Sequence, residues 1–309
     1  MDYEGQICRP STEKTTFMLA VAVGCSYNQC KFCTFFKHLK HRLLPMEQIE
    51  NELKRVRSLG GNPEKVFLGD GNAFGQDVSR LLDIASMVKR YFPNCGMINL
   101  DATITDIRDK TDEDLIRLRK AGFDRLYLGI ECGLDDVLTF MKKDHTVEQT
   151  YSQIQRLREA GLSYNAHIMT GIAGQGRGLE NARALAAYFN RTRPDRVVNF
   201  SLFLDKAAPL FQDIQTGRFE PADEIENLRE AYSLLELLEY DGLLYDGFHD
   251  YLGFRVWGRL PDDRQKMLLK LEKAIDTYNR KTPQVAYACP GAFQAEGYGR
   301  QPSSGPKVP

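Results

Sequence analysis

The sequence lacks the features that would direct it to a membrane, to secretion or to a polyanion. No apolar run approaches the length of a membrane span, about 18 residues, and the start of the chain, Met1–Gln6, is acidic and polar, unlike a secretion signal. The 41 basic and 42 acidic residues leave a net charge of −1, so no overall field attracts nucleic acid. We therefore expect a cytoplasmic location, no membrane partner, and nucleic acid as an unlikely partner.

Cysteine is scarce except in one short stretch. Cys25, Cys30 and Cys33 share a loop directly after the apolar run Phe17–Val23, whereas the other four cysteines stand singly. No second C-x-x-C pair or histidine cluster completes a zinc site, and a thioredoxin-like redox pair would not need Cys25. Three thiolates can hold three irons of a cubane and leave the fourth open to a substrate or cofactor. The loop therefore predicts a 4Fe-4S cluster.

Short apolar runs alternate with amphipathic helical patterns, as in parallel strands joined by helical crossovers. Strands are predicted at Thr16–Val23, Lys65–Gly69, Met97–Asp101, Arg125–Ile130, Tyr164–Thr170 and Val197–Leu204. Helices are predicted at Met46–Leu59, Asp77–Tyr91, Asp112–Ala121, Val147–Ala160 and Leu179–Thr192. Thr111 with Asp114, and Thr146 with Gln149, form capping boxes. These units predict an α/β fold, a partial (β/α)6 barrel of the TIM type, with ligands at the carboxyl ends of its strands.

The pattern changes after Leu204. A helix is predicted from Glu220-Pro221 to about Tyr240, an irregular segment around His249 and Trp257, and a second helix from Asp262 to about Arg280. We therefore expect a lead-in over 1–15, the partial barrel over 16–220, a C-terminal helical extension over 221–289 and a disordered tail over 290–309, which has few apolar residues.

With the cysteine loop at the end of the first strand, the chain resembles the radical S-adenosylmethionine (SAM) superfamily from about Thr16 to about Lys281. The resemblance is to the branch of oxygen-independent coproporphyrinogen oxidases and methylthiotransferases. Four residues separate Cys25 from Cys30, where the commonest family spacing has three. The resemblance implies an enzyme whose three cysteines bind a 4Fe-4S cluster. An electron from the cluster would cleave SAM to a 5'-deoxyadenosyl radical, which abstracts a hydrogen atom from a substrate.

The resemblance also implies residues that bind SAM. Gly69-Asp70-Gly71 follows the second strand, where the family has a turn that meets the amino group of the methionine moiety. Gly171 and Ile172 begin a Gly-Ile-Ala-Gly turn similar to one that lies against the adenine. A glycine pair after a strand can also serve only a tight turn.

Two side chains complete this cofactor set. Phe32, just before the last cysteine, matches an aromatic position against the adenine, and Glu131, at the end of the fourth strand, matches a position that binds the ribose hydroxyls. Glu131 could also be a solvated carboxylate at a strand end. No residue is assigned a catalytic role.

The substrate is expected at the strand ends that do not bind SAM. We therefore predict a substrate pocket that contains Asp101, His167 and Asp205. His167 could equally be a hydrogen-bonded core histidine, and Asp205 a solvated loop residue. Cys132 is more typical of a small buried hydrophobe than of a hydrogen donor.

Three functional hypotheses remain open. The first is a radical SAM enzyme that acts on a small molecule and takes electrons from a donor such as flavodoxin or ferredoxin. The second is a radical SAM modifier of RNA or protein that uses the basic stretch after the loop, Lys37, His38, Lys40, His41 and Arg42. The third is a structural metal-binding protein without catalysis.

Overall fold

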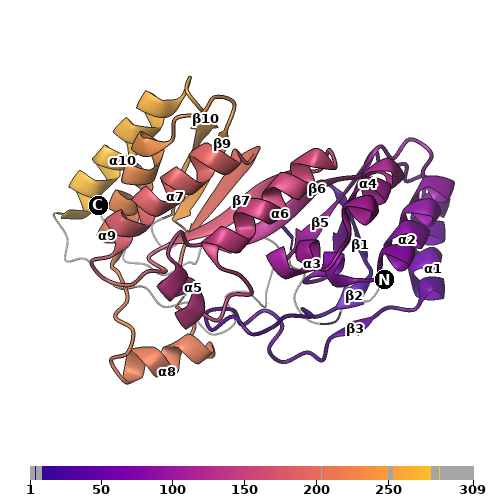
Figure 1. Ribbon diagram of the computed structural model, residues 1–309, viewed down its shortest axis with the longest axis horizontal. Helices are drawn as coiled ribbons and strands as arrows, with labels where there is room; N and C mark the ends of the chain where they lie inside the picture. The colour runs from indigo at the N-terminus through magenta and orange to yellow at the C-terminus, as the bar shows by residue number, and fades with distance from the viewer. Residues whose placement is uncertain (1–3, 5–8, 203, 250–252, 280–284, 286–309) are drawn as a thin grey trace.

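The described part of the chain forms a curved eight-stranded sheet with helices on its outer side, and a separate two-stranded sheet (Figure 1). The computed structural model describes residues 4, 9–202, 204–249, 253–279 and 285, so the predicted tail over 290–309 lies outside the described residues. The sheet contains, in spatial order, β1 (Phe17–Ala20), β4 (Lys65–Gly69), β5 (Met97–Ala102), β6 (Phe123–Glu131), β7 (Ser163–Thr170), β8 (Arg196–Ser201), β9 (Leu244–His249) and β10 (Phe254–Arg259). Neighbouring strands are parallel from β1 to β9, and β10 is antiparallel to β9.

The predicted alternation of strands and helices is confirmed. The crossover helices are α1 (Met46–Ser58), α2 (Val78–Tyr91), α4 (Asp112–Ala121), α6 (Val147–Glu159) and α7 (Gly178–Thr192). The capping boxes of Thr111 and Thr146 both form. The first predicted strand divides, because β1 ends at Ala20 and β2 (Ala22–Val23) pairs instead with β3 (Arg42–Leu43).

The segment after β8 continues the sheet. It contains the expected helices α9 (Glu224–Leu237) and α10 (Arg264–Asn279), a short helix α8 (Pro209–Gln215), and also strands β9 and β10. The prediction of an irregular segment around His249 and Trp257 is therefore wrong. Asp246 and Gly247 interrupt the apolar pattern of β9, but Arg255 on β10 binds both carboxylate oxygens of Asp246, at 2.8 and 2.9 Å, so the acid can be buried in a strand.

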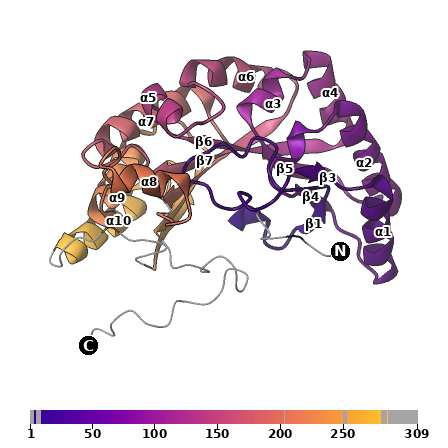
Figure 2. The same ribbon diagram turned by 90° about the horizontal axis from the view of Figure 1, so that it is seen from below.

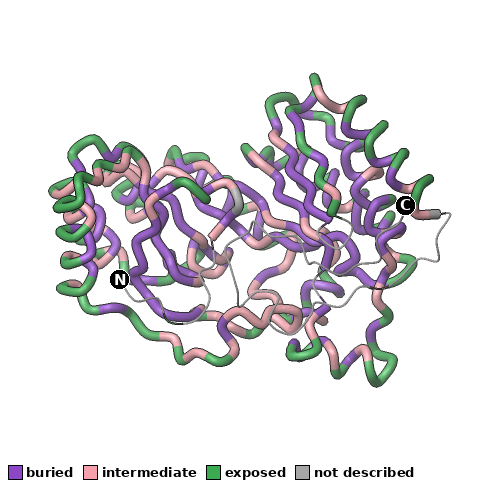
Figure 3. The backbone as a smooth tube through the Cα atoms, turned by 180° about the vertical axis from the view of Figure 1, so that it is seen from behind, coloured by how far each residue is buried: buried purple, intermediate pink, exposed green. Residues whose placement is uncertain are grey.

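Helices line the outside of an arch and strands its inside (Figure 2). In the described part of the chain, the edge strands β1 and β10 do not pair with each other, so the barrel is open. An open barrel is what the prediction of a partial barrel requires. Alternate strand residues such as Leu19, Leu68 and Leu100 are fully buried in the core beneath the outer helices. Figure 3 shows these buried strands, with exposed residues mostly on the helices. None of the described helices is long and apolar enough to cross a membrane.

The inner face of the sheet carries a row of rings. Consecutive ring centroids in the row Phe67, Tyr127, His167, Phe200 and Phe248 lie 5.8, 5.7, 6.0 and 5.4 Å apart. The row passes from β4 across β6, β7 and β8 to β9. Because these residues alternate with those of the helix-covered core, the inside of the arch is left for aromatic and polar groups.

Candidate functional site

The cysteine loop begins directly after β2, and Cys25, Cys30 and Cys33 are free and partly buried. Burial and the nearby thiols raise the pKa of Cys33 to about 11, while burial, opposed by Lys143, raises that of Cys30. Thiols of this kind become thiolates when a metal binds, which is the chemistry that a cluster requires. The three thiolates of such a loop would each bind a different iron of a cubane. In the described part of the chain, no three His, Cys, Asp or Glu residues converge as ligands of a single ion.

The turn after β4 supports the start of this loop. Gly71 has a φ of +55°, and a Cβ there would lie 2.4 Å from the carbonyl oxygen of Gly24. Asn72 Nδ2 donates to Ser26 Oγ at 2.9 Å, and Gly71 N donates to Asp70 Oδ1 at 3.0 Å. The predicted methionine-binding turn is thus in direct contact with the predicted cluster loop.

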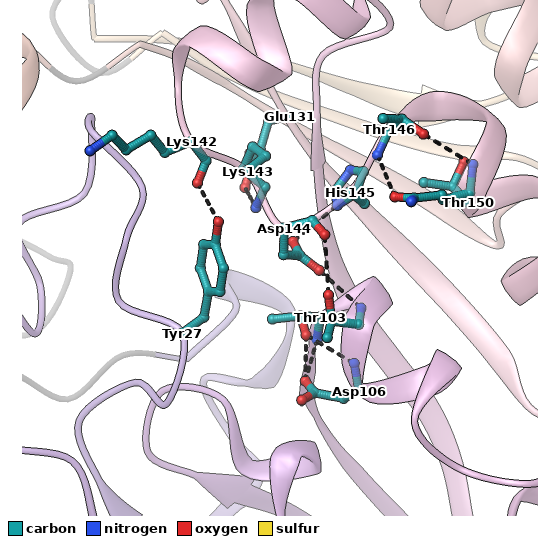
Figure 4. A network of polar contacts seen from close by, with 12 residues as sticks. Tyr27, Thr103, Asp106, Glu131, Lys142, Lys143, Asp144, His145, Thr146 and Thr150 are labelled. Atoms are coloured by element: carbon teal, nitrogen blue, oxygen red, sulfur yellow. Dashed lines mark hydrogen bonds and ion pairs between the residues drawn. The ribbon is translucent and has the colours of Figure 1, made fainter.

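The segment after the short helix α5 (Asp135–Phe140) holds the other side of the loop (Figure 4). Tyr27 Oη donates to the carbonyl oxygen of Lys142 at 2.6 Å, and Lys31 N donates to that of Met141 at 3.0 Å. Further along, Thr34 Oγ1 donates to Asp205 Oδ2 at 3.0 Å. Asp205 therefore contacts the end of the cysteine loop, and its place in a substrate pocket stays a prediction.

Lys143 is a buried cation between the loop and Glu131. Its Nζ lies 3.3 Å from Glu131 Oε1, and its side chain is only 8% exposed. Burial opposes its charge, but Cys30, Glu131 and Asp144 outweigh burial and raise the pKa of Lys143. The pattern around Lys143 indicates no functional role, because charged side chains such as a lysine pair in a connecting segment are usually solvated.

Local backbone geometry allows this pair to form. Glu131 has a φ of +62° at the end of β6, and a Cβ at Gly129 would lie 2.3 Å from Glu131 Oε1 and 3.1 Å from Lys143 Nζ. Asp144 fixes the position of the segment that contains Lys143. Its Oδ2 accepts a hydrogen bond, at 3.0 Å, from the backbone nitrogen of Thr105, which lies in the helix α3 (Ile104–Arg108) after β5. Figure 4 shows Glu131, Lys143 and Asp144 together.

The turn after β7 lies against the same loop through apolar contacts. Ile172 is fully buried, and Phe32 packs on the apolar cluster that contains Ile172, Met169 and Leu202. Gly171 N donates to Glu230 Oε2 at 2.8 Å. Phe32 and Ile172, predicted to flank the adenine, thus belong to one cluster.

Asp101 on β5 and His167 on β7 lie on the inner face of the sheet, with β6 between their strands. Burial and the charges of Asp70 and Glu13 raise the pKa of Asp101 well above its usual value, which favours the protonated carboxyl. Burial and then Lys143 lower the pKa of His167 to about 4, so its ring is neutral at neutral pH. Its Nε2 atom is buried and has no hydrogen-bond partner among the described residues. The two groups can therefore exchange hydrogen bonds with a ligand inside the arch.

Cys132 is not part of this polar surface. It is 1% exposed, and its Sγ donates to Asn181 Oδ1 at 3.1 Å. Burial raises the pKa of its thiol. These observations agree with a small buried side chain.

Comparisons with known proteins define the class. Residues 19–185 match the radical SAM superfamily, so the chain belongs to that superfamily and is an enzyme whose cofactors are a 4Fe-4S cluster and SAM. Escherichia coli coproporphyrinogen III oxidase, a radical SAM enzyme, superposes with a TM-score of 0.54 at 15% identity, covering 72% of this chain and 52% of the other. That likeness confirms the fold.

Two curated relatives are named for tRNA. A Herpetosiphon aurantiacus tRNA-2-methylthio-N(6)-dimethylallyladenosine synthase is 28% identical over 50% of this chain and 36% of its own length. A Methanocaldococcus jannaschii tRNA uridine(34) acetyltransferase is 26% identical over 37% of this chain and 21% of its own length. The chain therefore matches about a third or less of each. The expectation that nucleic acid is an unlikely partner is not supported, because radical SAM enzymes use small-molecule or RNA substrates.

The contact at Gly71 yields a prediction for cluster loading. Gly71→Ala should misplace the start of the loop, because its Cβ would overlap the Gly24 carbonyl group. We expect less than half of the wild-type iron and sulfide per chain after anaerobic reconstitution. Gly60→Ala is the matched control, since Gly60 also has a positive φ, +83°, but a Cβ there meets nothing within 4 Å. Equal iron content in the two variants would contradict the assigned contact.

Proposed function

We propose that Cys25, Cys30 and Cys33 bind the 4Fe-4S cluster, and that the enzyme cleaves SAM reductively to abstract a hydrogen atom from a small-molecule substrate held inside the arch. One observation carries the proposal: the cysteine loop, the Gly71 turn, Glu131 with Lys143, and the Gly171 turn meet at the carboxyl edge of one parallel sheet. Ligands of such sheets bind at that edge.

The chain fits these cofactors through its donors and its packing. Three thiols on one loop supply three ligands, and the loop is held from both sides before any metal binds. When bound, the cluster supplies an electron to SAM, which splits into methionine and a 5'-deoxyadenosyl radical that takes hydrogen from the substrate. The residues around it keep the reacting groups in place and exclude water.

Each end of SAM has a proposed contact. The backbone of Gly69-Asp70-Gly71, which is packed on the cysteine loop, receives the methionine amino group. Glu131 accepts hydrogen bonds from the ribose hydroxyls, and Phe32 and Ile172 hold the adenine between apolar surfaces. Lys143 balances the charge of Glu131 and of the thiolate of Cys30, and it offers a cation to the methionine carboxylate.

Asp101 and His167 are the proposed substrate contacts. A protonated carboxyl donates a hydrogen bond, and a neutral imidazole can donate or accept one, so a polar uncharged part of a substrate suits this pair. The rings of Tyr127 and Phe200, which flank His167, suit an apolar or planar part. We also propose that a flavodoxin-like or ferredoxin-like protein supplies the electron, in the reducing cytoplasm.

Removal of the ligands tests the proposal. Cys25→Ala, Cys30→Ala and Cys33→Ala should each abolish 5'-deoxyadenosine formation, because the cluster loses a ligand while the helix-covered core is untouched. Product analysis by chromatography and iron analysis after anaerobic reconstitution measure this. Cys95→Ala is the control, since Cys95 is a buried core residue. A cluster of wild-type content in the three loop variants would refute the assignment.

The buried cation gives a separate prediction. Lys143→Gln keeps a donor toward Glu131 but removes the charge, so we expect SAM to bind about tenfold more weakly, equivalent to about 1.4 kcal/mol, and the cluster to be harder to reduce. Calorimetric titration and redox titration of the loaded protein measure the two effects. The neighbouring exposed residue supplies the control, Lys142→Gln. Equal behaviour of the two variants would remove Lys143 from the site.

Modification of tRNA is the second candidate, favoured by the names of the two relatives. Exposed Lys40 and Arg42 lie just beyond the cysteine loop and could contact phosphates. Binding through phosphates weakens steeply as salt rises.

Binding of unmodified tRNA separates the two candidates. If the substrate is a small molecule, we expect a dissociation constant weaker than about 1 µM at physiological salt, the range of non-specific binding. Tighter binding, with a steep salt dependence that decreases in Lys40→Ala, would favour the tRNA candidate. Filter binding or fluorescence anisotropy measures this at several salt concentrations.

A further inference from the structure

One buried carboxylate connects the exits of two strands. Glu230 lies on α9, in the segment after the predicted barrel, and is 1% exposed. Its Oε2 accepts from Gly171 N at 2.8 Å, at the exit of β7. Its Oε1 accepts from Asn181 Nδ2 at 2.7 Å, on α7.

Asn181 extends this link to the exit of β6. It is fully buried, and its Oδ1 accepts from Gly133 N at 2.8 Å and from Cys132 Sγ at 3.1 Å. These donors fix the orientation of the amide, because a flip would place its NH2 group against the N–H of Gly133. Its Nδ2 must therefore face an acceptor, and Glu230 is that acceptor.

Close packing leaves little freedom to this network. A Cβ at Gly171 would lie 2.4 Å from Asn227 Oδ1, and one at Gly178 would lie 3.1 Å from Glu230 Oε2. A Cβ at Gly133 would lie 2.7 Å from the backbone nitrogen of Leu185. The two strand exits and helices α7 and α9 therefore meet at van der Waals distance, and a shift of one turn must displace the others.

We propose that Glu230 is a positioning residue that, through Asn181, sets the distance between the turns that follow Glu131 and Thr170. The proposal rests on the proposed function, in which those turns hold the ribose and the adenine. Glu230 does not touch SAM in this proposal. It acts by fixing Gly171 relative to Gly133, two residues after Glu131, so that both halves of the adenosine site are formed before SAM binds.

The hydrogen-bond pattern allows a reciprocal test. In Glu230→Gln one acceptor becomes a donor and faces either Gly171 N–H or the NH2 group of Asn181. In Asn181→Asp a second carboxylate faces Glu230. In the double variant all groups match again. The new carboxylate at position 181 accepts from Gly133 N–H and from the new amide at position 230, and the oxygen of that amide accepts from Gly171 N–H.

The measurement is calorimetric binding of S-adenosylhomocysteine to cluster-loaded protein. Burial raises the pKa of Glu230 to about 8, against the hydrogen bonds from Gly171 and Asn181. Binding is therefore measured at pH 8.5, where the carboxylate predominates. The other titratable groups facing it are Glu226 on α9, Tyr245 on β9 and Cys132 after β6. The control is Glu236→Gln, the same change at an exposed position of α9.

We expect each single variant to bind S-adenosylhomocysteine about tenfold more weakly, and the double variant to bind within threefold of wild type. The KM for SAM should rise in the single variants while kcat for 5'-deoxyadenosine formation stays within twofold. Singles that bind like wild type, or a double variant that shows the product of the two losses, would overturn the proposal.

Folding and function are separated by two further observations. If a single variant loses its native circular dichroism, only the double variant is used for the test, and its affinity should be near that of wild type. A double variant that is unfolded, or that is native-like but binds tenfold more weakly, contradicts the network. If wild-type protein with its cluster binds no S-adenosylhomocysteine, the proposed function itself fails. Wild-type binding with unaffected single variants removes only the role of Glu230.

Discussion

The contact between the turn after β4 and the start of the cysteine loop leaves no room for a side chain, and the arrangement of the site depends on it. A Cβ at Gly71 would overlap the Gly24 carbonyl, and Asn72 reaches Ser26 one residue past Cys25. The loop then leaves in a direction that brings Tyr27 to Lys142. Because these contacts order the three cysteines that we propose as ligands, less conformational entropy would remain to be lost when a cluster binds.

Charge at this edge is balanced by a single connecting segment. Lys143 lies among Cys30, Glu131 and Asp144, and its ammonium group is nearly inaccessible to water, so salt screens these interactions little. The same segment supplies the carbonyl groups that receive Tyr27 and Lys31. One short stretch therefore holds the loop by hydrogen bonds and compensates its charge.

The sequence predicted those parts that depend on local patterns. Three cysteines on one loop, alternating strands and helices, and the capping boxes of Thr111 and Thr146 can each be recognised within a few residues. Strand β9 could not be recognised, since the buried Asp246 is compensated by arginines on the two neighbouring strands, Arg255 on β10 and Arg196 on β8. From the sequence, Lys143 looks like a solvated loop charge and Glu230 like a solvated helix charge, and tertiary contacts make them buried groups.

The contacts that cross residue 220 show how the later segment completes the arch. Strand β9 pairs in parallel with β8, and the ring of Phe248 stacks on Phe200 at 5.4 Å. Without α9, the amide of Gly171 would lose its acceptor in a buried place, at a cost of about 1–3 kcal/mol. Without β9, the inner face beside His167 would end at Phe200. The segment after residue 220 thus continues the sheet, and both parts of the chain bound the inside of the arch, where the proposed function places the substrate.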